Sequence, residues 1–426
     1  MIPNRLRIVV CSPFARLRTD VITFFRLDSV QIPNELSGNK SVVQPDNAVK
    51  SSHPVEKVGA FLKRVAHLFE AKAFRPHRMF RGGHAQTLAA FAWPRRRKFK
   101  SVRDQERFFQ TAPDVKVLAH CRWQPNPKDH PTMIIWHGIE GSSESTYMLS
   151  TAQKSFSSGF NVIRMNLRTC GGTEHLTTTI YHGGLTEDLH AVVSELIEQD
   201  HLSRLFLVGF SLGGNMVLKL AGEYADNAPK EVLAVCAISP SIDLQASALL
   251  ILKRSNWLYQ EDFVRRLKHR LRVKHKLFPD QYDITGLSSV RTLREFDDRF
   301  TSRTHGFDGA DDYYYRASSI RVIDRIRIPT LIIHAEDDPF IPFAPMLDPA
   351  VANNPYILLV APKQGGHVAF LSAKQHSSNH LLPDAHQHSA LGTQHSALEE
   401  HSSLPEDRFW AENRVVEFCR LAEETF

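Results

Sequence analysis

The chain has 426 residues, of which 42% are hydrophobic and 23% charged, and its formal net charge at pH 7 is +6. This length suffices for one large α/β domain with insertions or for two modest domains, and one domain is the simpler prediction. No apolar run reaches the length of about 18 residues that a membrane span needs, so we expect a soluble, cytoplasmic protein.

Five cysteines are scattered without a Cys-x-x-Cys pair, which indicates a reduced compartment and no disulfide framework. Basic clusters at residues 94–100 and 268–276 suggest nucleic-acid binding, but the sequence has no helix-turn-helix, RNA-recognition or zinc-finger pattern. The same clusters would attract an anionic membrane surface, and a solvated face is the simpler interpretation of each. We expect no nucleic-acid partner, and a peripheral membrane contact stays open.

Residues 1–55 are predicted to form a poorly ordered leader. Its apolar stretch Ile8-Val9-Val10 is too short for a signal-peptide core, whereas the surrounding arginines would also suit an organellar transit peptide. Apolar side chains recur at helical spacing from residue 55 to residue 74, which predicts a helix there.

Residues 115–240 alternate apolar runs with helical stretches, which predicts parallel strands joined by crossover helices. Residues 133–137 and 161–165 are two of the expected strands, and residues 186–199 form an expected helix.

The most informative segment, residues 205–217, joins a buried-strand pattern, a Gly-x-Ser-x-Gly turn and a helix start. Small residues on both sides of Ser211 are needed where a strand and a helix pass closely at a sharp turn. The five-residue pattern also arises by chance, but its flanks favour a nucleophile elbow over an ordinary strand-to-helix turn. Ser211 is therefore the predicted nucleophile.

A serine on such a turn requires an acid and a histidine later in the chain, each after a strand. Residues 329–335 form a strand pattern followed by acidic residues, of which Asp338 is the predicted triad acid and Asp337 the alternative. The next strand pattern, residues 356–360, precedes a turn with two glycines and His367, the predicted base.

An acyl-transfer site also needs hydrogen-bond donors for the oxyanion of its tetrahedral intermediate. The backbone N–H groups of Ile139 and Leu212 are the predicted donors, the second because it follows the nucleophile directly. His137 begins the loop that carries Ile139, and we expect its side chain to brace this loop rather than to transfer protons.

Two segments interrupt the strand and helix alternation. Residues from about 241 to about 325 are predicted to form a helical cap, whose apolar residues suit both a roof over an acyl pocket and plain helix packing. Residues from about 373 to about 405 repeat histidines in a Ser, Gln and Ala background. No carboxylate or cysteine set completes a metal site there, so a flexible insertion is the preferred interpretation. A final helix is expected over residues 409–423.

The chain resembles the YheT-like esterases of the α/β-hydrolase fold, which are related to plant embryogenesis-associated proteins and mammalian abhydrolase-domain lipases. The resemblance covers roughly residues 70–372 and the final helix, and the His-rich insertion departs from it. It rests on the elbow, the acid and histidine loops and on residues 74–76, 82–88, 166–173, 294–297, 305–307, 312–314 and 318–319.

The resemblance implies a mostly parallel central sheet flanked by helices and a helical cap insertion. It also implies a carboxylic-ester hydrolase for lipid-like or short to medium acyl esters, with no metal and no organic cofactor. The triad carries over as Ser211, Asp338 and His367.

We therefore expect a serine esterase that works through an acyl-enzyme intermediate. Amides and thioesters pass through the same intermediate, so peptidase, thioesterase and acyltransferase activities stay open. The alternative is a non-catalytic hydrolase-fold protein whose basic surface meets membranes or nucleic acid. A fold kept only for binding has no physical need of all three triad residues, which disfavours this alternative. The sequence predicts no oligomeric state.

Overall fold

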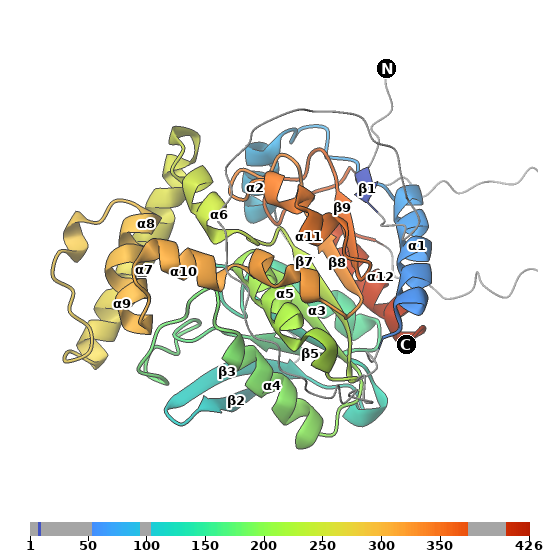
Figure 1. The fold of residues 1–426 in the computed structure, drawn as a ribbon, viewed down its shortest axis with the longest axis horizontal. Helices are drawn as coiled ribbons and strands as arrows, with labels where there is room; N and C mark the ends of the chain where they lie inside the picture. The colour runs from blue at the N-terminus through green and yellow to red at the C-terminus, as the bar shows by residue number, and fades with distance from the viewer. Residues whose placement is uncertain (1–6, 10–52, 94–103, 374–405) are drawn as a thin grey trace, which may run out of the picture.

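Nine strands form one sheet in the computed structural model, which describes residues 7–9, 53–93, 104–373 and 406–426 (Figure 1). Their order across the sheet is β1-β9-β8-β7-β6-β4-β5-β3-β2. The strands are β1 (Arg7–Val9), β2 (Gln105–Ala112), β3 (Val115–Arg122), β4 (Thr132–Trp136), β5 (Asn161–Met165), β6 (Leu205–Phe210), β7 (Val232–Ile238), β8 (Thr330–Ile333) and β9 (Ile357–Ala361).

The centre of the sheet, from β5 through β4, β6, β7 and β8 to β9, is parallel. Every residue of these six strands is buried, as expected for near-continuous apolar runs covered on both faces. The predicted fold class, a mostly parallel sheet flanked by helices, is confirmed.

The prediction of parallel strands across residues 115–240 is wrong for β3. This strand is antiparallel to both of its neighbours, β2 and β5. Only Pro113 and Asp114 separate β2 from β3, and so short a connection can join antiparallel strands but not parallel ones.

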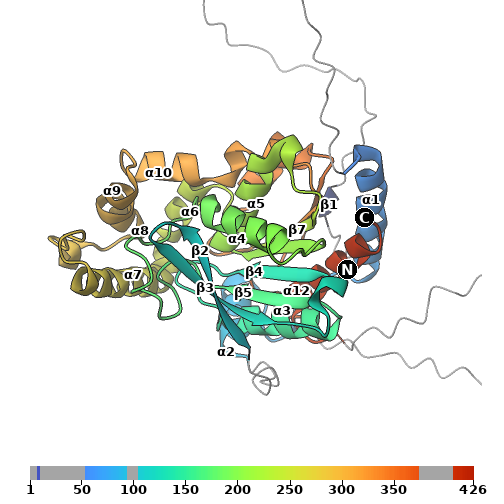
Figure 2. The same ribbon diagram turned by 90° about the horizontal axis from the view of Figure 1, so that it is seen from below.

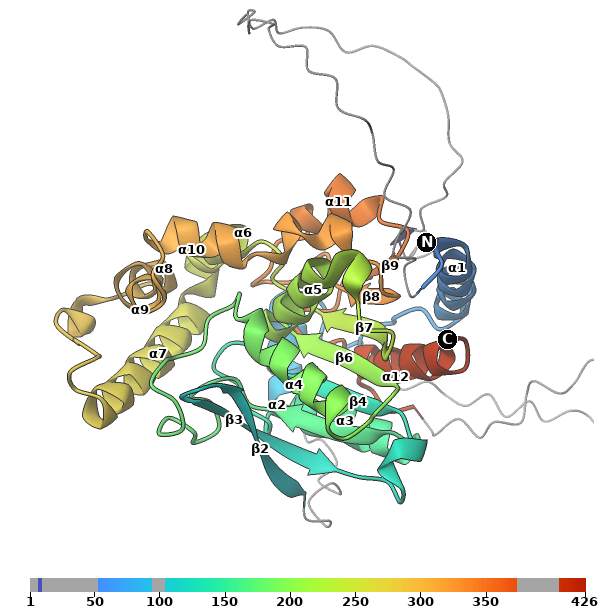
Figure 3. The same ribbon diagram turned by 60° about the horizontal axis from the view of Figure 1, so that its bottom comes forward.

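Helices cover both faces of the sheet (Figures 2 and 3). On one face α3, α12 and α1 pack together, and on the other α4 packs on α5, which lies against β6 and β7. The helices are α1 (Val55–Ala71), α2 (Gly83–Ala92), α3 (Thr146–Ser157), α4 (Thr186–Glu198), α5 (Leu212–Tyr224), α6 (Leu244–Ile251), α7 (Trp257–Leu277), α8 (Leu293–Phe296), α9 (Ser302–His305), α10 (Ala310–Ala317), α11 (Pro349–Ala352) and α12 (Trp410–Glu423).

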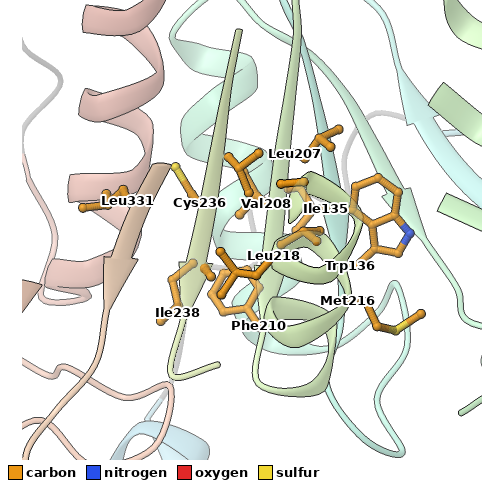
Figure 4. Packing of buried hydrophobic residues seen from close by; sticks show 14 of the residues in the cluster. Ile135, Trp136, Leu207, Val208, Phe210, Met216, Leu218, Cys236, Ile238 and Leu331 are labelled. Atoms are coloured by element: carbon orange, nitrogen blue, oxygen red, sulfur yellow. The ribbon is translucent and has the colours of Figure 1, made fainter. Parts of the chain in front are cut away.

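The core lies where β6 passes between β4 and β7. Val208 of β6 lies beside Ile135 of β4 and Cys236 of β7 on one face of the sheet, and Leu207 of β6 points to the other face, where Leu218 of α5 is also buried (Figure 4). All five side chains are fully buried, which removes apolar surface from water at about 25 cal/mol per Å². This packing fixes the position of the turn at which β6 ends and α5 begins.

The long connection between β7 and β8 holds α6 to α10, of which α7 to α10 lie at the end of the molecule opposite α1, at the left in Figure 1. Most of the predicted leader and the predicted His-rich insertion lie outside the described residues. Within the leader, Arg7–Val9 forms β1, which pairs antiparallel with β9. In the part of the chain that the structure describes, no helix has the length and apolar character needed to cross a membrane.

Candidate active site

Ser211 lies on a sharp turn between β6 and α5. Its φ of +53° is in the left-handed region, a conformation that costs a non-glycine residue about 1–3 kcal/mol. A Cβ atom on Gly209 would lie 2.2 Å from the carbonyl oxygen of Gly213, so strand and helix can pass this closely only without that side chain. The Gly-x-Ser-x-Gly pattern thus has its steric reason in the structure.

The side chains of Ser211, His367 and Asp338 form one hydrogen-bonded chain. Ser211 Oγ lies 3.0 Å from His367 Nε2, and His367 Nδ1 lies 2.8 Å from Asp338 Oδ2. The carboxylate can only accept, so Nδ1 carries the proton and Nε2 of the neutral ring accepts from the serine hydroxyl.

The Asp338 carboxylate is held in its charged form. Burial alone would raise the pKa of Asp338, but the charge and hydrogen bond of His367 outweigh burial and lower this pKa. Its other oxygen, Oδ1, accepts hydrogen bonds from the backbone N–H groups of Phe340 and Ile341. A fixed anion of this kind can orient the imidazole and stabilise its cation.

Asp337, the alternative acid, has a different set of partners. Its Oδ1 accepts hydrogen bonds from the backbone N–H groups of Gly365 and Gly366, each at 2.9 Å. Burial raises its pKa, against the effect of these two bonds. Asp337 therefore ties down the turn that leads to His367, while Asp338 contacts the imidazole itself.

Helix α2 braces the histidine loop, which the sequence analysis did not foresee. The backbone N–H of His367 donates to Thr87 Oγ1 at 2.9 Å, and that of Leu371 donates to Gln86 Oε1 at 2.9 Å. The Phe340 ring packs against the imidazole, with their centroids 4.6 Å apart. Thr87 and Gln86 lie in segment 82–88, one of the segments that carry the family resemblance. The sequence did not indicate that this segment contacts the His367 loop.

The loop after β4 lies beside Ser211. A Cβ atom on Gly138 would be 2.9 Å from Ser211 Cβ. The fully buried His137 ring accepts a hydrogen bond from Leu167 N–H at Nε2 and donates from Nδ1 to the Gly138 carbonyl. Burial lowers the pKa of His137 to about 4, so the ring is neutral and acts as a brace.

Ile139 and Leu212 both line the cavity that contains Ser211 and His367. Neither backbone N–H donates a hydrogen bond to an acceptor among the described residues. Glu140, which follows Ile139, adopts a φ of +52° and anchors the loop after β4. Tyr181 donates to Glu140 Oε1, and the guanidinium of Arg270 on α7 pairs with both carboxylate oxygens at 2.9 and 3.1 Å.

The cavity in front of Ser211 has a volume of about 930 Å³ including its open mouth. The side chains that line it are mainly apolar, and six of the apolar ones come from α6 and α7. These are Leu244, Ala248, Ile251, Phe263, Leu267 and Leu271. Other apolar residues of these helices, Leu249, Trp257 and Leu258, are exposed to solvent instead, as is Leu252 directly after α6.

A metal site and a reactive cysteine, two other kinds of functional site, have no support in the described residues. Nowhere in residues 7–9, 53–93, 104–373 and 406–426 do three His, Cys, Asp or Glu side chains group so that they could hold a metal ion. Cys170 is buried, and burial raises the pKa of its thiol to about 12, which makes it a packing residue rather than a nucleophile.

Comparison with known proteins agrees with this architecture. The sequence model of the family described as "alpha/beta hydrolase fold" matches residues 131–374. The putative esterase YheT of Escherichia coli is 32% identical over 303 residues, which cover 70% of this chain and 87% of the bacterial protein.

Two eukaryotic relatives match a shorter part. The monoacylglycerol lipase of Saccharomyces cerevisiae is 32% identical over 252 residues, 56% of this chain and 55% of the yeast protein. Phospholipase ABHD3 of Mus musculus is 30% identical over 242 residues, 57% of this chain and 58% of the mouse protein. The matched region is thus little more than half of either eukaryotic protein. Because the family match spans more than half of the chain and the bacterial match spans most of both proteins, the chain belongs to the α/β-hydrolase esterase family.

Proposed function

We propose that the protein is a serine carboxylic-ester hydrolase with Ser211, His367 and Asp338 as its catalytic triad. The observation that carries this proposal is the continuous hydrogen-bonded chain from Ser211 Oγ through the imidazole to Asp338, at the wall of an apolar cavity. Family membership supports hydrolysis, and the names of the relatives, which include an esterase, a lipase and a phospholipase, support ester substrates.

In the proposed reaction, His367 Nε2 takes the Ser211 proton as Oγ attacks the ester carbonyl carbon. The backbone N–H groups of Ile139 and Leu212 donate to the resulting oxyanion, while Asp338 stabilises the imidazolium. His367 then returns the proton to the leaving alcohol, which yields the acyl-enzyme. Water, deprotonated by His367, attacks this ester, and His367 returns that proton to Ser211 Oγ as Oγ departs and the acid is released.

We further propose that residues 241–325 act as a cap that forms the acyl-binding wall. Side chains from α6 and α7 line the cavity, and their apolar character suits short to medium acyl or lipid-like esters. The non-catalytic alternative is disfavoured because a binding function gives no reason for the strained Ser211 backbone or for an anionic Asp338 held against His367.

Variants of the triad test the proposal. With p-nitrophenyl esters of increasing acyl length, Ser211→Ala and His367→Ala should lower kcat by about 10⁴-fold to 10⁶-fold. Asp338→Asn should lower it by about 10⁴-fold, because an amide no longer selects the productive tautomer of the ring.

The matched control is Asp337→Asn. An amide oxygen can still accept from Gly365 and Gly366, so its loss should be far smaller than that of Asp338→Asn. Equal losses in the two variants, with circular dichroism showing that both are folded, would contradict the assignment of Asp338.

The contact between Arg270 and Glu140 suggests that the cap positions the Ile139 loop. Arg270→Met should lower kcat by about tenfold with little change in KM, since the loop loses its anchor and a buried carboxylate loses its partner. Arg266→Met on the same helix is the control, because its exposed pair with Asp262 contributes little to stability. A kcat for Arg270→Met equal to that of the control would refute this positioning role.

We also propose peripheral contact with an anionic membrane through the turn between α6 and α7. Lys253 and Arg254 are exposed there and form no ion pair with a described residue, and they lie between exposed apolar side chains. Trp257 and Leu258 are 58% and 61% exposed, and they follow in the chain after Ile251, which lines the cavity. Cations beside apolar side chains complement an acidic lipid surface.

Co-sedimentation with vesicles tests this contact. The native protein should bind phosphatidylcholine vesicles that contain phosphatidylserine more strongly than pure phosphatidylcholine vesicles. The double variant Trp257→Ser, Leu258→Ser should lose most of that binding, whereas Phe108→Ser, which removes a ring on β2 that is 51% exposed, should keep it. If the double variant and the Phe108→Ser control bound phosphatidylserine-containing vesicles equally well, this would contradict the proposed contact surface.

A further inference from the structure

One carboxyl group in the cavity wall has no part in the proposed triad. Asp297 lines the same cavity as Ser211 and His367, and only 7% of this residue is exposed. It begins a π-helical turn, Asp297–Thr301, between α8 and α9. Single π-helical turns are rare and occur frequently at functional sites, so this local irregularity is a reason to ask what Asp297 binds.

The described partners of Asp297 are both neutral. Thr301 Oγ1 donates to its Oδ1 at 2.8 Å, and the Tyr314 hydroxyl donates to its Oδ2 at 2.7 Å. No Lys, Arg or His of the described chain forms an ion pair with it. Burial raises the pKa of Asp297 to about 6, although the two hydroxyl donors act against that rise. The hydrogen-bond partners of this carboxyl group in the described chain are thus two hydroxyl groups and no cation.

The cavity wall that contains Asp297 is otherwise largely apolar. Phe296, Leu293 and Leu267 line the cap side of the cavity with hydrocarbon. An acyl chain without polar groups that filled this space would displace water from the carboxylate and offer no hydrogen bond in return, which disfavours its binding. A carboxylate has about four acceptor sites, and Thr301 and Tyr314 use two of them. A ligand group that donates a hydrogen bond would complete the set.

We propose that Asp297 forms a polar subsite that binds a hydrogen-bond donor, a hydroxyl or an ammonium group, on the ester substrate. This inference rests on the proposed esterase function and narrows its substrate class. The apolar walls would accept the hydrocarbon part of the substrate, and the carboxylate would select esters that carry a donor at one distance from the carbonyl carbon. Esters of the same size without the donor would be disfavoured, because they exclude water from the remaining acceptor sites of the carboxylate and supply no hydrogen bond to replace it.

The test compares three series of p-nitrophenyl esters with equal numbers of non-hydrogen atoms: alkanoates, ω-hydroxyalkanoates and ω-aminoalkanoates. Because the donor must reach one fixed position, each series covers several chain lengths. At the matching length, kcat/KM for a donor-bearing ester should exceed that of its alkanoate counterpart by about tenfold, the effect of one hydrogen bond. At other lengths the alkanoates should be preferred.

Two variants of Asp297 identify the donor. Asp297→Ala should abolish the preference. Asp297→Asn keeps an acceptor oxygen but no charge, so a preference for a hydroxyl should survive and a preference for an ammonium group should be lost. Asp298→Asn is the matched control on the same π-helical turn. The Asp298 carboxylate accepts from the Ala310 N–H and is not among the cavity-lining residues, so this variant should keep the native preference.

The outcomes separate the subsite from the triad. A native protein that hydrolyses plain alkanoates but never favours a donor contradicts the subsite alone. The same holds if Asp297→Ala lowers the melting temperature while the preference is unchanged, since Asp297 would then only join α10 to the π-helical turn. A folded native protein that hydrolyses no ester contradicts the proposed function and the subsite together.

Discussion

The close approach of β6 and α5 at Ser211 is the constraint on which the rest of the site depends. A parallel sheet brings the carboxyl ends of its strands to one edge, so the loops after β4, β6, β8 and β9 meet there without any sequence proximity. The glycine at position 209 lets the helix begin directly beneath the strand, and the resulting strain at Ser211 is held by the packed core of β4, β6 and β7. The turn thus presents the hydroxyl where the His367 loop ends.

Four buried or half-buried carboxyl groups around this edge differ in what satisfies them. Asp338 is paired with His367 and stays charged, whereas Asp337 accepts backbone N–H groups and supports the histidine loop. Glu140 forms an ion pair with Arg270 of α7. Asp297 has two neutral donors and no cation. We therefore propose that the same functional group serves orientation of the imidazole, loop support, attachment of α7 and substrate selection, according to its partners.

The sequence predicted the parts of the fold that local patterns encode. Apolar runs identified β4, β5, β6, β8 and β9, and the elbow pattern singled out Ser211 for the position at which the structure has its strained turn. Local patterns carry no information on which distant side chains meet. Asp337 and Asp338 are adjacent in the chain and differ only in the direction that the turn gives them, and the contact of Thr87 with the His367 loop joins residues 280 positions apart. The antiparallel β3 was mispredicted because its apolar pattern also suits a parallel strand.

The most direct test of the catalytic centre is covalent labelling followed by peptide mass spectrometry. The native protein is treated with a fluorophosphonate, which reacts with an activated serine, and the digest is searched for the modified residue. The account predicts a single adduct on Ser211 in the native protein and none in folded His367→Ala, because the hydroxyl is a weak nucleophile without its base. An adduct on another residue, or a folded native protein that does not react, would contradict it.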